Sequence, residues 1–131
     1  MSKRPPTVCV DIDGVIATGG KEVYSNEAGW AYEKCQVIPE GKAMLEKLRE
    51  NDIFIILHTA RWESDRAKTE EWLNDNEILY DKLVMGKPSA DLYIDDRNWP
   101  EPFRPTAVSI IGALVHAVKS RHGHHIEPNK E

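Results

Sequence analysis

Short apolar runs alternate with amphipathic stretches along the chain. Four runs predict strands, at residues 7–10, 53–57, 80–85 and 92–94. The run at 53–57 is continuously apolar, which is typical of a strand that is buried on both faces of a sheet. Apolar residues at helical spacing predict helices over 39–51, from Ser64 or Asp65 to about Asn76, and over 107–118. Strands that alternate with helices predict an α/β fold with a mostly parallel sheet covered on both faces.

Two connections lack such a period. Residues 15–38 are interrupted by glycines and are expected to form a functional loop, with room for a small hairpin. Its aromatic residues, Tyr24, Trp30 and Tyr32, are expected either to line a substrate entrance or to pack the loop itself. Residues 99–105 hold three prolines and predict an irregular loop. We expect one domain over residues 1–121, followed by a polar tail over residues 122–131.

Length and charge narrow the class of protein. A chain of 131 residues corresponds to one domain. Its 17 Lys and Arg against 22 Asp and Glu give a net charge of −5, which argues against a nucleic-acid partner because such partners require a basic face. Two cysteines are too few for a disulfide framework and predict reduced thiols and a cytoplasmic location. We expect no signal peptide and no membrane partner, because no apolar stretch has the required length.

Polar side chains follow every predicted strand. They are, in chain order, Asp11 and Asp13, Thr59, Lys87, and the pair Asp95 and Asp96. In open α/β sheets ligands bind outside the carboxyl ends of the strands, so these groups are expected at one edge. Clustered carboxylates stay ionised only with a cation between them, and an all-oxygen set suits Mg²⁺. Each residue alone also has an ordinary role as a turn, a cap or a surface charge, and only the set predicts a site.

The hydroxyl of Thr59 and the ammonium of Lys87, facing such an ion, would hold the oxygens of a phosphoryl group. Charge stabilisation of this kind is the main requirement of phosphoryl transfer. A carboxylate can act as the nucleophile, and a second carboxylate beside it can act as acid and base. Arg61 and Arg97 are candidates for binding a substrate anion, with ordinary surface charge as the alternative. The pattern therefore predicts a magnesium-dependent phosphoryl-transfer site.

These segments resemble the motifs of the haloacid dehalogenase (HAD) superfamily of phosphohydrolases. Residues 8–15, VCVDIDGV, are similar to the first motif, and residues 55–59, IILHT, are similar to the second. Residues 86–88, GKP, and residues 92–96, LYIDD, are similar to the third and fourth. The order and spacing match from residue 8 to about residue 98. Val15 stands where many members have Thr, which removes one hydroxyl near the site.

The resemblance implies a role for each residue. Asp11 would be the nucleophile, and Asp13 would protonate the leaving group, activate water and bind Mg²⁺ through its backbone carbonyl. We expect Thr59, Ala60, Arg61 and Lys87 to contact the substrate. The expected metal ligands are Asp11, Asp13, Asp95 and Asp96, the last directly or through water. The implied fold is a single Rossmannoid domain with the Asp11 strand in the centre of its sheet and with no cap domain.

These residues leave three alternative functions. The first is a Mg²⁺-dependent phosphomonoesterase acting on a small phosphorylated metabolite such as a sugar phosphate. The second is a 3′-end polynucleotide phosphatase. The third is a receiver-like signalling domain, whose order of motifs differs because its Lys-Pro comes last, whereas here Lys87 precedes Asp95. Capless members close their sites with a partner subunit or a large substrate, so a homo-oligomer is consistent with the resemblance.

Overall fold

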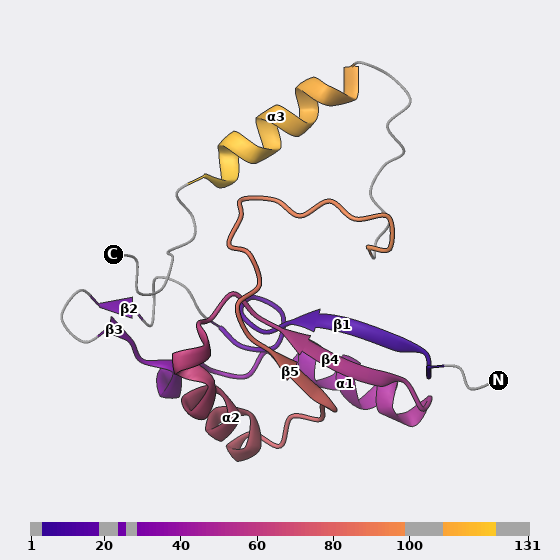
Figure 1. Ribbon diagram of the computed structural model, residues 1–131, viewed down its shortest axis with the longest axis vertical. Helices are drawn as coiled ribbons and strands as arrows, with labels where there is room; N and C mark the ends of the chain where they lie inside the picture. Colours follow the sequence, from indigo (N-terminus) through magenta and orange to yellow (C-terminus); the bar gives the residue numbers. More distant parts are fainter. Residues whose placement is uncertain (1–3, 19–23, 26–28, 99–108, 123–131) are drawn as a thin grey trace. The chain divides into compact units, whose positions relative to one another are not determined.

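The computed structural model describes residues 4–18, 24–25, 29–98 and 109–122. They fall into two compact units, the first ending at Pro88 and the second beginning at Ser89, and each is described by itself. The first unit contains all the strands (Figure 1). The predicted proline-rich loop at 99–105 lies outside the described residues, as does the polar tail beyond His122. Within the described ranges, no helix is long and apolar enough to cross a membrane.

Three parallel strands form the sheet of the first unit. They are β1 (Thr7–Asp11), β4 (Phe54–His58) and β5 (Lys82–Val84), in the order β1-β4-β5. Asp11 pairs with His58, and His58 in turn pairs with Val84. The predicted α/β fold with a parallel sheet is therefore confirmed. The expectation that the Asp11 strand is central is wrong, because β4 is the middle strand of the sheet and β1 lies at its edge.

The predicted strand at 92–94 does not form. These residues belong to the second unit, where Tyr93 and Ile94 are exposed. In the described part of that unit the regular structure is helix α3 (Ser109–Arg121), so the unit itself offers no strand as a partner. A strand requires a neighbouring strand for its ladder hydrogen bonds, and a run of three residues makes only a few of them.

Two helices and a short hairpin complete the first unit. Helix α1 (Pro39–Glu50) starts with proline at a position where its missing N–H costs nothing, and helix α2 (Arg66–Asp75) follows a 3₁₀ turn, η3 (Glu63–Asp65). Strands β2 (Tyr24–Ser25) and β3 (Gly29–Trp30) pair as a small hairpin, which the sequence allowed for in the glycine-interrupted connection. Another 3₁₀ turn, η2 (Tyr32–Lys34), follows this hairpin. The predicted helices at 39–51 and at 64–76 are thus confirmed.

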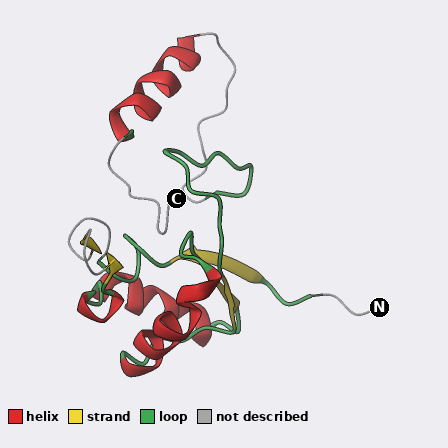
Figure 2. Cartoon of the chain, turned by 60° about the vertical axis from the view of Figure 1, so that its left-hand side comes forward, coloured by secondary structure: helices red, strands yellow, loops and turns green. Residues whose placement is uncertain are grey.

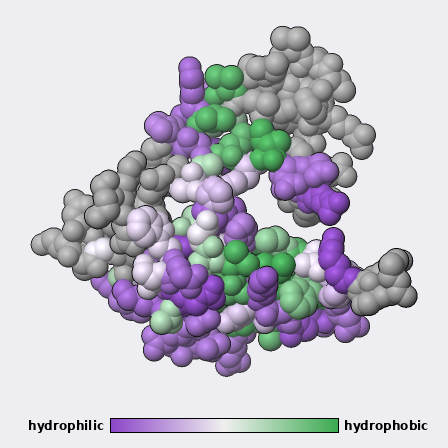
Figure 3. All heavy atoms as spheres, in the orientation of Figure 1, coloured by the Kyte–Doolittle hydropathy of each residue, from purple (hydrophilic) through white to green (hydrophobic). Residues whose placement is uncertain are grey.

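The helices of the first unit cover one face of the sheet. Ile55 and Leu57 of β4 are fully buried in one cluster with Leu45 of α1 and Leu73 of α2. Alternate residues of a strand share a face, so both helices pack on that side, as Figure 2 shows. Hydrophobic residues also gather on the opposite face, over β1 and β4 (Figure 3), where Cys9 is exposed. The prediction that 53–57 is buried on both faces is therefore wrong, because its burial alternates along the strand.

Helix α1 approaches the turn that follows β1 at Gly41. This turn is closed by the N–H groups of Val15, Ile16 and Ala17, which all donate to the carbonyl of Ile12. A Cβ added at Gly41 would lie 1.9 Å from the carbonyl oxygen of Val15. Only glycine permits this approach, which fixes the backbone just after Asp13 against the helix.

We expect Gly41→Ala to destabilise the protein, although alanine favours a helix. The added methyl group must displace backbone, and such overpacking typically costs about 1–3 kcal/mol. Urea unfolding of both proteins measures the difference. Glu46→Ala, an exposed change in the same helix, is the control and should lie within about 0.5 kcal/mol of wild type. An unchanged or raised stability of Gly41→Ala would show that the contact is not tight in solution.

Candidate functional site

The expected residues of the first unit meet at the carboxyl edge of the sheet. Asp11 ends β1, and Thr59 directly follows β4. The N–H of Thr59 donates to the carbonyl of Val84 at 3.0 Å, and the N–H of Lys87 donates to the carbonyl of Thr59 at 2.8 Å. The pairing of β4 with β5 therefore continues beyond the strands. It places Lys87 beside Thr59, as the sequence predicted for strands that end at one edge.

Asp11 is a desolvated carboxylate with a cation nearby. Its Oδ1 accepts a hydrogen bond from the N–H of Ile12 at 2.9 Å, and its Oδ2 lies 3.9 Å from Nζ of Lys87. Burial raises the pKa of Asp11 above its ordinary value, and the attraction of Lys87 offsets this only in part. A poorly hydrated carboxylate beside an ammonium group is an arrangement typical of functional sites.

Asp13 is bound by a buried arginine. Arg61 Nε donates to Asp13 Oδ2 at 3.0 Å, and Arg61 Nη2 donates to Asp13 Oδ1 at 2.7 Å. Arg61 is only 3% exposed, and its guanidinium carbon lies 3.8 Å from the centre of the Tyr32 ring. Burial alone would lower the pKa of Arg61, but its hydrogen bonds and charge pairing with Asp13 raise it. The guanidinium therefore stays charged and is directed at Asp13.

Sequence reasoning missed the residues that surround this arginine. Arg61 Nη1 donates to the hydroxyl of Thr69 at 3.1 Å, and Nη2 lies 4.0 Å from the Cys35 sulfur. Thr69 lies on the same face of α2 as Trp72. A polar residue on that apolar face indicates a buried hydrogen bond, and this signal was available in the sequence. Tyr32, which was expected to line an entrance or to pack the loop, is buried. The side chains of Tyr24 and Trp30 lie outside the described residues.

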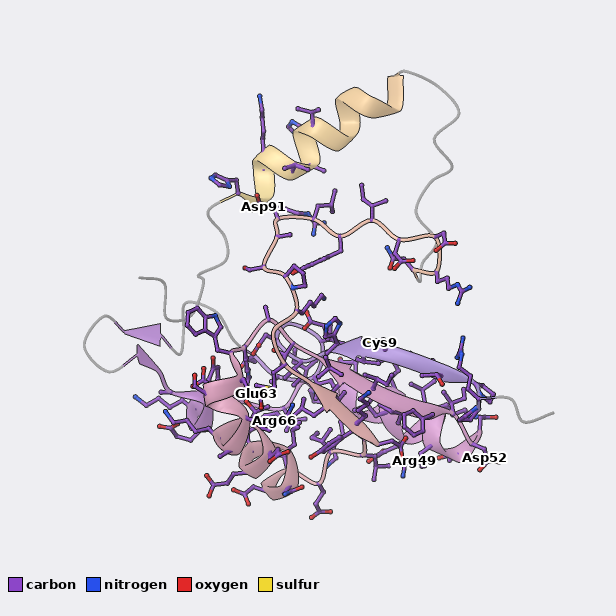
Figure 4. The ribbon with its side chains drawn as sticks, in the orientation of Figure 1. Cys9, Arg49, Asp52, Glu63, Arg66 and Asp91 are labelled. Atoms are coloured by element: carbon purple, nitrogen blue, oxygen red, sulfur yellow. The ribbon has the colours of Figure 1, made fainter. Side chains whose placement is uncertain are left out.

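Residues 62–66, which follow Arg61, make contacts through charged groups. Glu63 and Arg66 form an ion pair at the start of α2 (Figure 4), and Arg66 Nη2 also donates to the carbonyl of Leu83 at 3.3 Å. Ala60 is half-buried between Thr59 and Arg61. Trp62, in contrast, is 41% exposed. Arg66 therefore links the start of α2 to β5, while the indole of Trp62 stays accessible.

Asp95 and Asp96 lie in the second unit, in an exposed turn. Asp95 Oδ1 accepts a hydrogen bond from the N–H of Arg97 at 3.0 Å, and this bond lowers the pKa of Asp95. Across the part of the chain that the structure describes, no three His, Cys, Asp or Glu side chains form a group that could hold a metal ion.

The donors of the first unit fit a magnesium ion in part. Asp11 offers the hard carboxylate oxygens that Mg²⁺ prefers. Both side-chain oxygens of Asp13 already accept hydrogen bonds from Arg61. Lys87 and Arg61 also supply two positive charges against two carboxylates. The charges of Asp11 and Asp13 are therefore balanced by Lys87 and Arg61, a compensation that the sequence did not reveal.

Comparison with known proteins shows the fold and no more. No protein-family model and no curated protein sequence matches the chain. A crystal structure of a structural-genomics target from Vibrio cholerae aligns with a TM-score of 0.54 at 20% identity, over 85% of this chain and 97% of that one. A chain of the Pnkp1/Rnl/Hen1 complex aligns with a TM-score of 0.55 at 19% identity, over 93% of this chain and 36% of that one.

A second structure, of the Pnkp1/Rnl/Hen1 RNA repair complex, aligns with a TM-score of 0.52 at 18% identity, over 93% of this chain and 34% of that one. This chain therefore spans about a third of the length of those two. All three likenesses concern the α/β fold described here.

In metal-free buffer, we expect Asp11→Asn to be more stable than wild type at pH 7. The folded-state pKa of Asp11 is raised, so ionisation of this carboxyl opposes folding. Below its unfolded-state pKa, about 3.9, the carboxyl is protonated in both states and the difference should vanish. The advantage of the variant should grow as pH rises through the interval above that value. Urea midpoints measured across this pH range test the prediction.

Asp75→Asn, an exposed change at the end of α2, controls for the loss of a surface carboxylate. A wild-type protein that is more stable than Asp11→Asn at neutral pH would show that the attraction of Lys87 outweighs desolvation.

Proposed function

We propose that this chain is a phosphomonoesterase that forms an aspartyl-phosphate on Asp11. One observation carries the proposal: Asp11, the buried hydroxyl of Thr59 and the ammonium of Lys87 lie at one edge of a parallel sheet. A carboxylate nucleophile, a hydroxyl donor and a fixed cation are the groups that phosphoryl transfer requires. The resemblance of four segments to the HAD motifs, in the order of that superfamily, supports the same function.

In the first step Asp11 attacks the phosphorus atom, and the bond from phosphorus to the substrate oxygen breaks. Oδ1 of Asp11 accepts the N–H of Ile12, so we assign the attack to Oδ2, on the side of Lys87. The electron pair of the broken bond goes to the leaving oxygen, which takes a proton from Asp13. Lys87 and Thr59 stabilise the negative charge on the oxygens that remain on phosphorus.

In the second step a water molecule attacks the phosphorus atom of the aspartyl-phosphate. Asp13, now a carboxylate, takes a proton from this water while the bond from phosphorus to Asp11 breaks. Inorganic phosphate leaves, and both the Asp11 carboxylate and the Asp13 acid are restored. Asp13 can serve in both steps because its side chain is 34% exposed, although Arg61 binds it from the protein side.

Mg²⁺ is the cofactor that we propose, and when bound it would neutralise charge between the phosphoryl group and the carboxylates. The proposed ligands are Asp11, the backbone carbonyl of Asp13, Asp95 and Asp96. The two hydrogen bonds from Arg61 occupy the side-chain oxygens of Asp13, which favours the backbone oxygen of Asp13 as the ligand. Oxygen-only sets of this kind suit a magnesium ion that keeps some of its waters.

A small phosphorylated metabolite, such as a sugar phosphate, is the first candidate substrate, and the net charge of −5 favours it. A nucleic-acid 3′-phosphate end is the second. Two observations favour this second candidate. Two of the similar folds occur in an RNA repair complex, and the exposed indole of Trp62 directly follows Arg61. Exposed aromatic rings are the usual platforms on which unpaired bases stack.

We expect the wild-type chain to hydrolyse p-nitrophenyl phosphate with Mg²⁺, and EDTA to abolish the activity. Asp11→Asn should remove turnover, because an amide cannot attack phosphorus. Lys87→Ala should lower kcat by about 10²–10³-fold, as expected for the loss of a group that stabilises the transferring charge. Lys82→Ala is the matched control, because Lys82 is exposed at the opposite end of β5. It should keep the wild-type rate.

An Asp11→Asn variant with wild-type turnover would falsify the assignment of the nucleophile. A chain that takes up one phosphoryl group from a donor and never turns over would instead indicate the receiver-like function.

A panel of substrates separates the two candidate classes. If the substrate is a nucleic-acid end, Trp62→Ala should raise KM for a 3′-phosphorylated oligonucleotide about 10-fold, from the loss of roughly 1–3 kcal/mol of base stacking. The rate on a sugar phosphate should not change. Trp62→Phe keeps an aromatic face and should restore most of the affinity. Equal KM values for wild type and Trp62→Ala on the oligonucleotide would remove this support for a nucleic-acid substrate.

A further inference from the structure

Arg61 has little capacity left for a substrate. Two of its N–H groups bind the two oxygens of Asp13, and Nη1 binds the hydroxyl of Thr69. Nη2 also lies 4.0 Å from the sulfur of Cys35. A bidentate pair fixes both the distance and the plane of the carboxylate. Arg61 therefore acts on Asp13, and whatever holds Arg61 also sets the orientation of Asp13.

The ring of Tyr32 covers one face of the guanidinium. The distance of 3.8 Å from the guanidinium carbon to the ring centre is that of a cation–π contact. Tyr32 is 2% exposed, and its hydroxyl lies 3.4 Å from Oδ2 of Asp65 in η3. Its position on η2 places it in the long connection between β1 and α1, two residues after the end of β3. Because the ring covers one face of the guanidinium, the guanidinium cannot tilt out of the plane that it shares with the carboxylate of Asp13.

We propose that Tyr32 is a positioning residue, which acts through Arg61 to aim Asp13 at the oxygen of the leaving group. The inference rests on the proposed phosphatase function. Each oxygen of a carboxylate has two lone pairs, and the fork uses one of them on each oxygen. The second lone pair carries the proton that Asp13 gives to the leaving group. Thr69 assists Tyr32 by holding Nη1 from the side of α2.

The dependence of the rate on the leaving group separates this role from simple packing. An alkyl phosphate has a poor leaving group, so its cleavage requires proton donation, whereas p-nitrophenolate leaves without it. The constant kcat/KM reports the transfer of the phosphoryl group to Asp11, before water enters. A misaligned Asp13 should therefore lower kcat/KM for the alkyl ester selectively. A general loss of folded protein lowers both values by one factor.

We expect Tyr32→Leu to lower kcat/KM for an alkyl phosphate by about 10-fold or more relative to its effect on p-nitrophenyl phosphate, a part of the usual range for acid catalysis. Tyr32→Phe keeps the stacked ring and should retain the wild-type ratio of the two constants. Tyr80→Leu is the matched control, because Tyr80 also packs against the core but precedes β5, at the strand end opposite Lys87. It should leave the ratio unchanged.

Thr69→Val keeps the volume of Thr69 and removes the hydrogen bond to Arg61, so it tests the same idea if Tyr32→Leu does not fold. It should shift the ratio in the same direction by a smaller factor. An unchanged ratio in an active, folded Tyr32→Leu or Thr69→Val protein overturns the inference. A wild-type chain without phosphatase activity, or an active Asp11→Asn variant, overturns the proposed function instead.

Discussion

Arg61 joins four other segments of the first unit, three through its buried guanidinium and one through its backbone carbonyl. It forks Asp13 after β1, stacks on Tyr32 of η2 and binds Thr69 of α2. Its backbone carbonyl accepts the N–H of Gly86, after β5, at 2.9 Å. Taking a cation out of water costs several kcal/mol, which only a paired anion and satisfied N–H groups can offset. The fold of the first unit and the orientation of Asp13 therefore depend on the same interaction.

A second Arg–Asp ion pair lies at the other end of the sheet and makes a different contribution to stability. Asp81 accepts the N–H of Ile55 at 2.7 Å and pairs with Arg49 of α1 at 3.0 Å. This pair is partly exposed, and surface pairs typically contribute about 1 kcal/mol or less. It fixes where β4 starts relative to α1. The buried pair at Arg61 is instead placed where a carboxylate needs a defined direction.

The carboxyl edge combines groups that are unfavourable for stability. Asp11 is desolvated, and Lys87 offsets that desolvation only in part. Such an arrangement is retained where charge is needed for chemistry rather than for folding. Both helices of the first unit pack on one face of the sheet. Stability therefore comes from one well-packed face, while the charged groups collect at the strand ends.

The sequence alone determined the parallel α/β fold, most element positions and the residues at the strand ends. Apolar runs followed by Asp11, Thr59 and Lys87 are local patterns, and parallel strands necessarily end at one edge. It did not determine the strand order, the one-sided packing of β4 or the loss of the expected strand at 92–94. Those features depend on which elements become neighbours, which no local pattern encodes. The link from Tyr32 through Arg61 to Asp13 was decided only by tertiary structure, because a buried cation must find its partners across distant segments.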